Sequence, residues 1–268
     1  MKKLLASVVV FAFCVSLVQA GSITLRPMLG YGIGTGKIVM GTDRERDSTG
    51  KQTKNENLYY SAGSGIKIGV GLDTDVSENV ALGFDLGYSI GSKKETNKYK
   101  DPTYSSVDEL KTSFIPINAT LKVKTTIDKI TPFAGFGPTI LLAPKSIGTY
   151  SYTHGTNTKE KETETTYKLG FGYHGLVGIE YSLSDKMVLI TQLRVDQVSL
   201  KADKSKITKD TANGVDQLAG MDIRDKETTY EEDDSSDNSA NANVPRIGNT
   251  YTIPANSLTV GVGLGIKF

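Results

Sequence analysis

The chain has 268 residues, of which 31 are basic and 30 are acidic, so its formal net charge at pH 7 is +1. A chain this close to neutrality has no global charge with which to bind nucleic acid. Its 28 glycines, 13 tyrosines and absence of tryptophan suggest a β-rich protein, and its single cysteine excludes an intramolecular disulfide framework.

Residues 1–20 have the pattern of a cleavable secretory signal. Lys2 and Lys3 precede an apolar run from Leu4 to Val18, which is too short for a comfortable spanning helix of about 20 residues. Cys14 lies within this run and follows Phe13 where a lipoprotein site would have a small residue. We therefore expect a mature domain of residues 21–268 without any thiol.

Eight later segments alternate apolar residues with small or polar ones, which is the period of a strand with one apolar face. They run from Ile23 to Ile33, Ala62 to Leu72, Val80 to Ile90, Ile115 to Val123, Ala134 to Leu142, Tyr167 to Leu183, Met187 to Val195 and Leu258 to Phe268. The last is the most regular. At about 3.3 Å per residue and a tilt of roughly 40°, it rises about 28 Å, close to the ~25 Å apolar band of a membrane-spanning barrel.

The connections between these segments alternate between short and long. The long ones are polar and cover about residues 36–57, 92–110, 144–166 and 201–254. This pattern predicts an all-β, eight-stranded antiparallel up-and-down transmembrane β-barrel with short periplasmic turns and four long extracellular loops. A ten-stranded barrel is the alternative. Pro27, Pro132 and Pro138 remove ladder donors from the first and fifth strands, whose register is the least determined.

The signal, the eight strands, the alternating connections and the ending Leu264-Gly-Ile-Lys-Phe268 resemble the small outer-membrane β-barrels. This superfamily includes the OmpA transmembrane domain, OmpX and the opacity proteins. The resemblance implies location in the bacterial outer membrane and contact with its lipids and lipopolysaccharide. It also implies that Leu264, Ile266 and Phe268 form the signal by which the barrel-assembly machinery recognises the closing strand.

If the apolar faces meet lipid, polar side chains point into the barrel. We expect them to form a hydrogen-bonded salt-bridge network that fills the interior of so small a barrel. The residues expected in it are Arg26, Lys67, Asp85, Glu180, Arg194 and Asp196. Inward glycines leave a narrow or gated pore as the alternative. Asp73, at the end of the second strand, is expected only to form a turn.

Aromatic residues fall near the ends of the strands, where interfacial girdles are expected. The sequence places Tyr31, Tyr59, Tyr60, Tyr88 and Tyr167 near the outer ends, and Tyr181, Phe133 and Phe268 near the inner ends.

Few residues are candidates for catalysis or metal binding. His154 and His174 are the only histidines, and neither lies in a nucleophile motif. The acidic run containing Glu231, Glu232, Asp233, Asp234 and Asp237 does not match a calcium loop, so a solvated surface run is favoured over a metal site. We expect no cofactor and no catalysis.

Two functions remain open from the sequence. The first is a structural or surface-interaction role, adhesin-like, in which the long polar loops contact an extracellular ligand. The second is a small pore or permeability protein that passes ions or small solutes through the glycine-rich interior.

Overall fold

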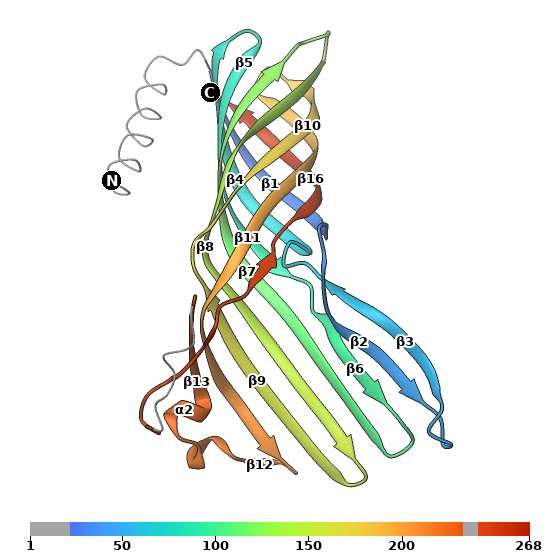
Figure 1. The fold of residues 1–268 in the computed structure, drawn as a ribbon. Helices are drawn as coiled ribbons and strands as arrows, with labels where there is room; N and C mark the ends of the chain where they lie inside the picture. The colour runs from blue at the N-terminus through green and yellow to red at the C-terminus, as the bar shows by residue number, and fades with distance from the viewer. Residues whose placement is uncertain (1–21, 233–240) are drawn as a thin grey trace.

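The computed structural model describes residues 22–232 and 241–268, so the expected signal and part of the acidic run lie outside it. The described chain is almost entirely β-structure (Figure 1). The strands are β1 (Ile23–Gly34), β2 (Ile38–Arg46), β3 (Gln52–Tyr60), β4 (Gly65–Ser77), β5 (Val80–Gly91), β6 (Lys94–Lys100), β7 (Tyr104–Lys124), β8 (Ile130–His154), β9 (Asn157–Tyr167), β10 (Gly170–Ser184), β11 (Met187–Ala212), β12 (Val215–Asp216), β13 (Glu227–Glu231), β14 (Arg246–Asn249), β15 (Thr252–Pro254) and β16 (Ser257–Lys267). The helical turns are η1 (Leu218–Gly220) and α2 (Ile223–Lys226). Within the described ranges, no helix is long and apolar enough to cross a membrane.

Eight of these strands pair antiparallel in a closed ring, in the order β1, β4, β5, β7, β8, β10, β11, β16 and back to β1. They overlap the eight segments with a two-residue period, although Ala62 precedes β4, Tyr167 belongs to β9 and Phe268 follows β16. Short links at residues 78–79, 125–129 and 185–186 join β4 to β5, β7 to β8 and β10 to β11 at one end of the ring. Among the described residues, eight strands close the ring without a further pair.

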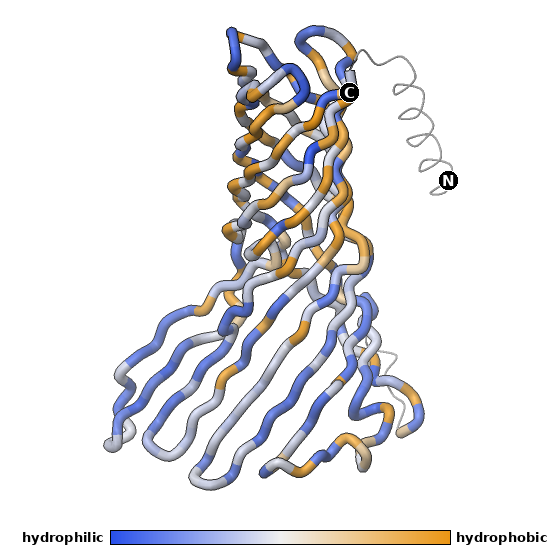
Figure 2. The backbone as a smooth tube through the Cα atoms, turned by 180° about the vertical axis from the view of Figure 1, so that it is seen from behind, coloured by the Kyte–Doolittle hydropathy of each residue, from blue (hydrophilic) through white to orange (hydrophobic). Residues whose placement is uncertain are grey.

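The outside of the ring is apolar and the inside is glycine-rich and polar. Outward residues such as Leu29, Leu193 and Val260 are about half exposed, while their neighbours along the strand face inward. Figure 2 shows hydrophobic positions concentrated along the ring and hydrophilic ones along the strands that leave it. Burial therefore follows the two-residue period of each strand.

The four segments expected as long loops are instead largely strands. β7, β8 and β11, with 21, 25 and 26 residues, continue from the ring into a second, open sheet that we call the fan. Its order is β3, β2, β6, β7, β8, β9, β11, and only β2 and β6 are parallel within it (Figure 1). The polar tracts fold this way because they are rich in Thr and Tyr and carry opposite charges across neighbouring strands. Examples are Lys145 to Glu164 and Lys209 to Glu160, each 2.5 Å.

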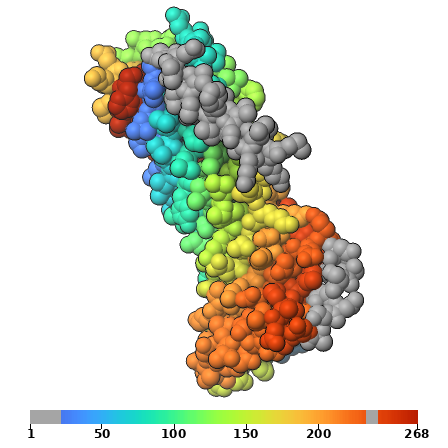
Figure 3. Space-filling view, turned by 90° about the vertical axis from the view of Figure 1, so that its left-hand side faces the viewer, coloured from blue at the N-terminus to red at the C-terminus, as the bar shows by residue number. Residues whose placement is uncertain are grey.

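The segment after β11 forms a lobe beside the fan. It contains η1, α2 and β13, which pairs with β11 and, in parallel, with β14. In Figure 3 this lobe, coloured orange to red, covers one side of the molecule away from the ring. β15 then returns along β11 to the ring.

Three aromatic residues expected in the girdles are buried instead, so that part of the prediction was wrong. Tyr59 is 52% exposed but Tyr60 only 2%, because adjacent strand residues face opposite sides. Tyr167 ends β9 and so does not share the outward phase of β10. Phe133 has the same phase as Thr139 and Leu141, which face the interior.

Candidate functional site

The interior of the ring holds a chain of ion pairs that begins near the short links. Arg26 on β1 is 1% exposed, and its guanidinium contacts Asp73 on β4 at 2.6 Å and Asp85 on β5 at 2.8 Å. Lys122 on β7 reaches the same Asp73 carboxylate at 2.6 Å. Gly71 permits this contact, since a Cβ there would lie 2.2 Å from Asp85 Oδ1. Two cations therefore share one buried carboxylate.

A second group of polar side chains lies further along the interior. Arg194 on β11 contacts Asp196 Oδ1 through Nε at 2.7 Å and also donates to Asn118 on β7. Lys67 on β4 reaches Asp196 at 3.0 Å and Ser257 on β16 at 2.6 Å. Arg194 Nη1 lies 3.8 Å from Asp85 Oδ2, so the two groups join at this carboxylate.

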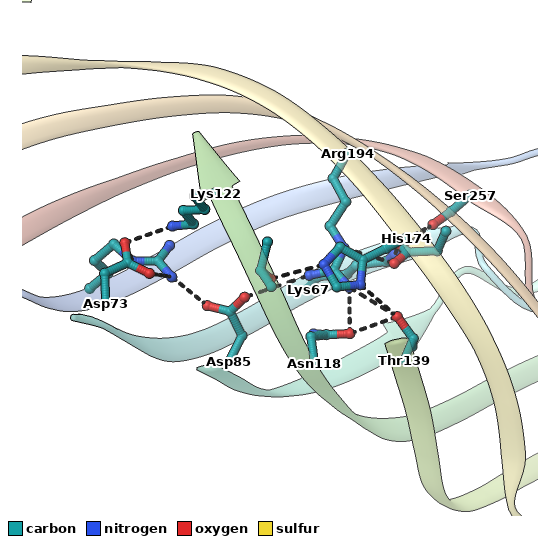
Figure 4. A network of polar contacts seen from close by, with 12 residues as sticks. Lys67, Asp73, Asp85, Asn118, Lys122, Thr139, His174, Arg194 and Ser257 are labelled. Atoms are coloured by element: carbon teal, nitrogen blue, oxygen red, sulfur yellow. Dashed lines mark hydrogen bonds and ion pairs between the residues drawn. The ribbon is translucent and has the colours of Figure 1, made fainter. Parts of the chain in front are cut away.

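His174 on β10 belongs to the same network. Its two ring nitrogens lie 2.9 Å from the hydroxyls of Thr120 and Thr139, and the residue is 1% exposed. Figure 4 shows these side chains converging from different strands. We call the whole set the interior network, and it consists of Arg26, Lys67, Asp73, Asp85, Asn118, Thr120, Lys122, Thr139, His174, Arg194, Asp196 and Ser257. Each of the eight ring strands contributes at least one member.

Five of the six residues predicted to lie in a salt-bridge network belong to the interior network. Arg26, Lys67, Asp85, Arg194 and Asp196 lie in the interior network. Glu180 is half-buried on β10 and forms no ion pair within the described part of the chain. The sequence did not predict Asp73 as a member, because its place beside a tight link is typical of a turn former. The two-residue period could have revealed its direction, because Asp73 lies on the same face of the strand as Gly69 and Gly71, which face inward.

Apolar clusters lie on both sides of the interior network. Where the ring meets the fan, buried apolar residues form a cluster: Tyr60, Ala62, Phe114, Leu141, Tyr167, Val198, Leu200, Ala202, Ile253 and Ala255. Toward the short links, Phe133, Leu176, Val188 and Ile190 pack together with Met28. A cavity of about 90 Å³ remains beside Lys67, Asp85 and Arg194. The interior is therefore largely filled by side chains.

The remaining candidate residues lie apart from this network. His154 is exposed at the end of β8, and its ring centroid is 6.2 Å from that of Tyr104. Glu231 ends β13, Glu232 pairs with Lys201, and Asp233, Asp234 and Asp237 lie outside the described residues. In residues 22–232 and 241–268, no three His, Cys, Asp or Glu side chains are grouped so as to hold a metal ion.

The closing strand β16 lies between β1 and β11. Leu264 pairs with Leu189, and Ile266 pairs with Leu25 on one side and Met187 on the other. The backbone N–H of Phe268 donates to the Ile23 carbonyl at 2.9 Å, and the residue is 77% exposed. The terminal residue is therefore fixed by its backbone while its ring remains on the surface.

Comparison with known proteins identifies this architecture. The family model described as the outer membrane protein beta-barrel domain matches residues 5–213. The chain belongs to this family. It is a small outer-membrane β-barrel protein of the bacterial outer membrane and lies in the lipid bilayer. A search of the curated proteins found no match.

Solved structures of outer-membrane proteins align along most of the chain. OprG from Pseudomonas aeruginosa is 9% identical, with 93% of this chain and 96% of OprG covered and a TM-score of 0.47. Neisserial surface protein A is 12% identical, with coverages of 92% and 96% and a TM-score of 0.34. AlkL in DMPC bilayers is 12% identical, with coverages of 93% and 90% and a TM-score of 0.41. These similarities are too low to transfer a function.

Proposed function

We propose that this family member is an eight-stranded transmembrane barrel that anchors an extracellular β-sheet and does not conduct. In this proposal residues 1–20 are cleaved, the short links face the periplasm, and the fan projects from the cell. β8 is roughly 80 Å long at about 3.3 Å per residue, whereas a tilted strand crosses the apolar band with about 10 residues. More than half of β8 therefore lies beyond the membrane.

The observation that carries the proposal is the filled interior. The interior network draws residues from all eight ring strands, and an apolar cluster lies between it and the fan. Charged side chains held in paired, hydrogen-bonded positions cost free energy to separate in a low-dielectric environment. A solute would have to break several such contacts and displace the apolar cluster to pass.

Surface interaction is the role that the fan supports. Its strands present both faces beyond the ring, and charged residues such as Lys111 and Lys204 are exposed on them. Cations near the membrane surface attract the phosphates of lipopolysaccharide. The C-terminal residues Leu264, Ile266 and Phe268 are proposed to be read by the barrel-assembly machinery before the ring closes.

We also propose that the protein has no catalytic activity and needs no cofactor. His174 already uses both ring nitrogens within the interior network. His154 packs against Tyr104 at a hairpin end. Neither arrangement provides the base and nucleophile pair that hydrolytic chemistry requires.

A narrow pore is the competing function, and the cavity of about 90 Å³ favours it. Planar-bilayer recordings of the detergent-folded protein separate the two. We expect the wild-type protein to be silent, and Arg194→Ala, which removes the side chain joining both halves of the interior network, to show increased leak. A stable unit conductance from folded wild-type protein would contradict the anchor proposal. Boiling-dependent mobility on a gel would verify folding of both proteins.

A further inference from the structure

A groove of about 820 Å³ lies on the fan and is separate from the interior network. Three neighbouring strands supply most of its lining, and β2 and β6 add Met40, Gly41, Thr96 and Asn97. Asp108 and Leu110 come from β7, Gly148 and Tyr150 from β8, and Lys159, Lys161 and Thr163 from β9. Tyr251 also lines it. The volume is within the range of about 300 to 1,000 Å³ that is usual for small-ligand sites.

The strand register places these side chains on one face. Tyr150 pairs with Asp108 on one side and Lys161 on the other, and paired residues in a sheet point the same way. Leu110 shares this face and packs against the apolar cluster at the junction with the ring. The groove therefore continues the inner face of the ring.

Aromatic rings extend from the groove toward the hairpin ends. Tyr104 and Tyr152 stack with centroids 5.8 Å apart and an interplanar angle of 24°, and the hydroxyls of Tyr104 and Tyr150 lie 3.3 Å apart. Tyr150 and Tyr152 are 6.1 Å apart. These mutual contacts fix the rings before any ligand arrives, which reduces the entropy lost on binding.

The polar groups around these rings favour a ligand with negative charge. Lys161 forms no ion pair with any described residue, and Lys159 has only Asp210, at 3.4 Å. The Asp108 carboxylate already accepts a hydrogen bond from Asn97 at 3.1 Å. Burial, with the neighbouring Tyr104 hydroxyl, raises the pKa of Tyr150 to about 12, so its hydroxyl remains a neutral hydrogen-bonding group. Asp108 and Glu109 also line the groove, and Glu109 forms an ion pair with Lys93. Lys161 is the groove cation that has no ion pair among the described residues, and it pairs across the strands with Tyr150.

We propose that this groove binds an acidic oligosaccharide from outside the cell, with sugar rings against Tyr150 and Tyr152 and carboxylates at Lys161 and Lys159. A pyranose ring has an apolar C–H face and polar edges, which match an aromatic ring flanked by hydrogen-bonding groups. A carboxylate gains charge-assisted hydrogen bonds from each ammonium. The inference rests on the proposed function, because it requires the fan to be displayed at the cell surface.

Calorimetric titration of the detergent-folded protein tests the site, with hexagalacturonate as the probe and maltohexaose as the neutral control of equal length. We expect hexagalacturonate to bind and the affinity to fall as salt rises. Lys161→Gln should weaken binding about tenfold, and Lys161→Arg should retain it. Lys111→Gln is the matched control, because Lys111 is exposed beside Leu110 on the opposite face of β7 and loses the same charge.

Three results would overturn the inference: no binding of hexagalacturonate, equal binding of maltohexaose, or equal weakening by Lys161→Gln and Lys111→Gln. Loss of hexagalacturonate binding on adding purified lipopolysaccharide would overturn the claim that the ligand comes from outside the cell, because the membrane's own lipopolysaccharide would then occupy the groove. A folded, silent barrel that does not bind the probe leaves the anchor proposal standing. Conductance by the wild-type barrel would overturn the anchor proposal whatever the sugar result.

Discussion

Asp73 is the carboxylate that two cations share. Arg26 and Lys122 both contact it at 2.6 Å, and its side chain is almost fully buried. Removing one member of a buried group leaves its partners with uncompensated charge, a cost of about 3–5 kcal/mol. Arg26 retains Asp85 after such a loss, but Lys122 has no other ion pair among the described residues.

Asp73→Asn should therefore lower the free energy of unfolding by about 3–5 kcal/mol. Urea unfolding in detergent or lipid, followed by intrinsic fluorescence or gel mobility, measures the change. Glu180→Gln is the control, because Glu180 is half-buried without an ion pair in the described chain. Equal effects of the two substitutions would show that burial of charge, and not the shared contact, determines stability here.

Asp47 offers a test of electrostatics outside the membrane, in the turn between β2 and β3. Its carboxylate accepts hydrogen bonds from the Thr49 hydroxyl at 2.6 Å and from the Thr49 and Lys51 amides at 2.9 and 3.0 Å. These bonds, the Thr49 hydroxyl first, lower the pKa of Asp47 below its ordinary value. A lowered folded-state pKa stabilises the turn above the unfolded pKa, and this stability is lost as pH falls through the folded pKa.

NMR titration of the Asp47 carboxyl should accordingly give a midpoint below 3.8. Thr49→Val removes the hydroxyl and should move the midpoint upward toward that value. An Asp47 midpoint that does not respond to Thr49→Val would assign the lowered pKa to the backbone amides alone.

Prolines lie where the ladder of paired residues is interrupted at two places in the ring. The β1 to β16 register passes from Leu25 directly to Met28, across Pro27. The β7 to β8 register is broken opposite Pro138, between its pairs at Thr139 and Phe136. Proline has no N–H to give the ladder, so side-chain contacts must hold the strands together at these points.

Gly137→Ala should be strongly destabilising because Gly137 lies at this interruption, where the β8 backbone closely approaches that of β7. A Cβ there would lie 1.8 Å from the Ala119 carbonyl oxygen, so the strands would have to move apart. Gly175→Ala on β10 is the matched control, since its Cβ would meet only the Gly135 oxygen at 4.0 Å. Urea midpoints of both variants measure the effect, and similar midpoints would mean that β7 and β8 can move apart here at little cost.

The sequence predicted the ring strands but not the fan. The ring segments alternate between apolar and small residues, and burial follows that alternation from Leu258 to Ile266. Residues 157–167 also have a two-residue period, but the residues that alternate are mostly Lys, Glu and Thr. A polar segment of this kind is typical of a solvated loop. Polar alternation stabilises a strand only when charged neighbours pair across it, as Lys145 and Glu164 do. That pairing depends on register between distant segments, which local sequence does not reveal.

The closed ring and the open sheet share three strands. β7, β8 and β11 pass between the two parts without interruption. Limited proteolysis of folded protein should therefore cut at the hairpin turns, at residues 47–51, 101–103, 155–156 and 213–214. Mass spectrometry of the fragments gives the sites. Frequent cuts within residues 104–112 or 157–166 would show that these segments are loops in solution.

The length of the β7 and β8 ladder has a mechanical consequence. Their paired residues run from Tyr104 and His154 at the tip to Lys124 and Phe133 deep in the ring. A ligand held at the tip pulls along the strands, so the load is shared as shear by many hydrogen bonds and is not applied to one bond at a time. Within the ring, the load passes to the interior network, whose side chains come from all eight ring strands. The fan is therefore attached to a rigid part of the molecule.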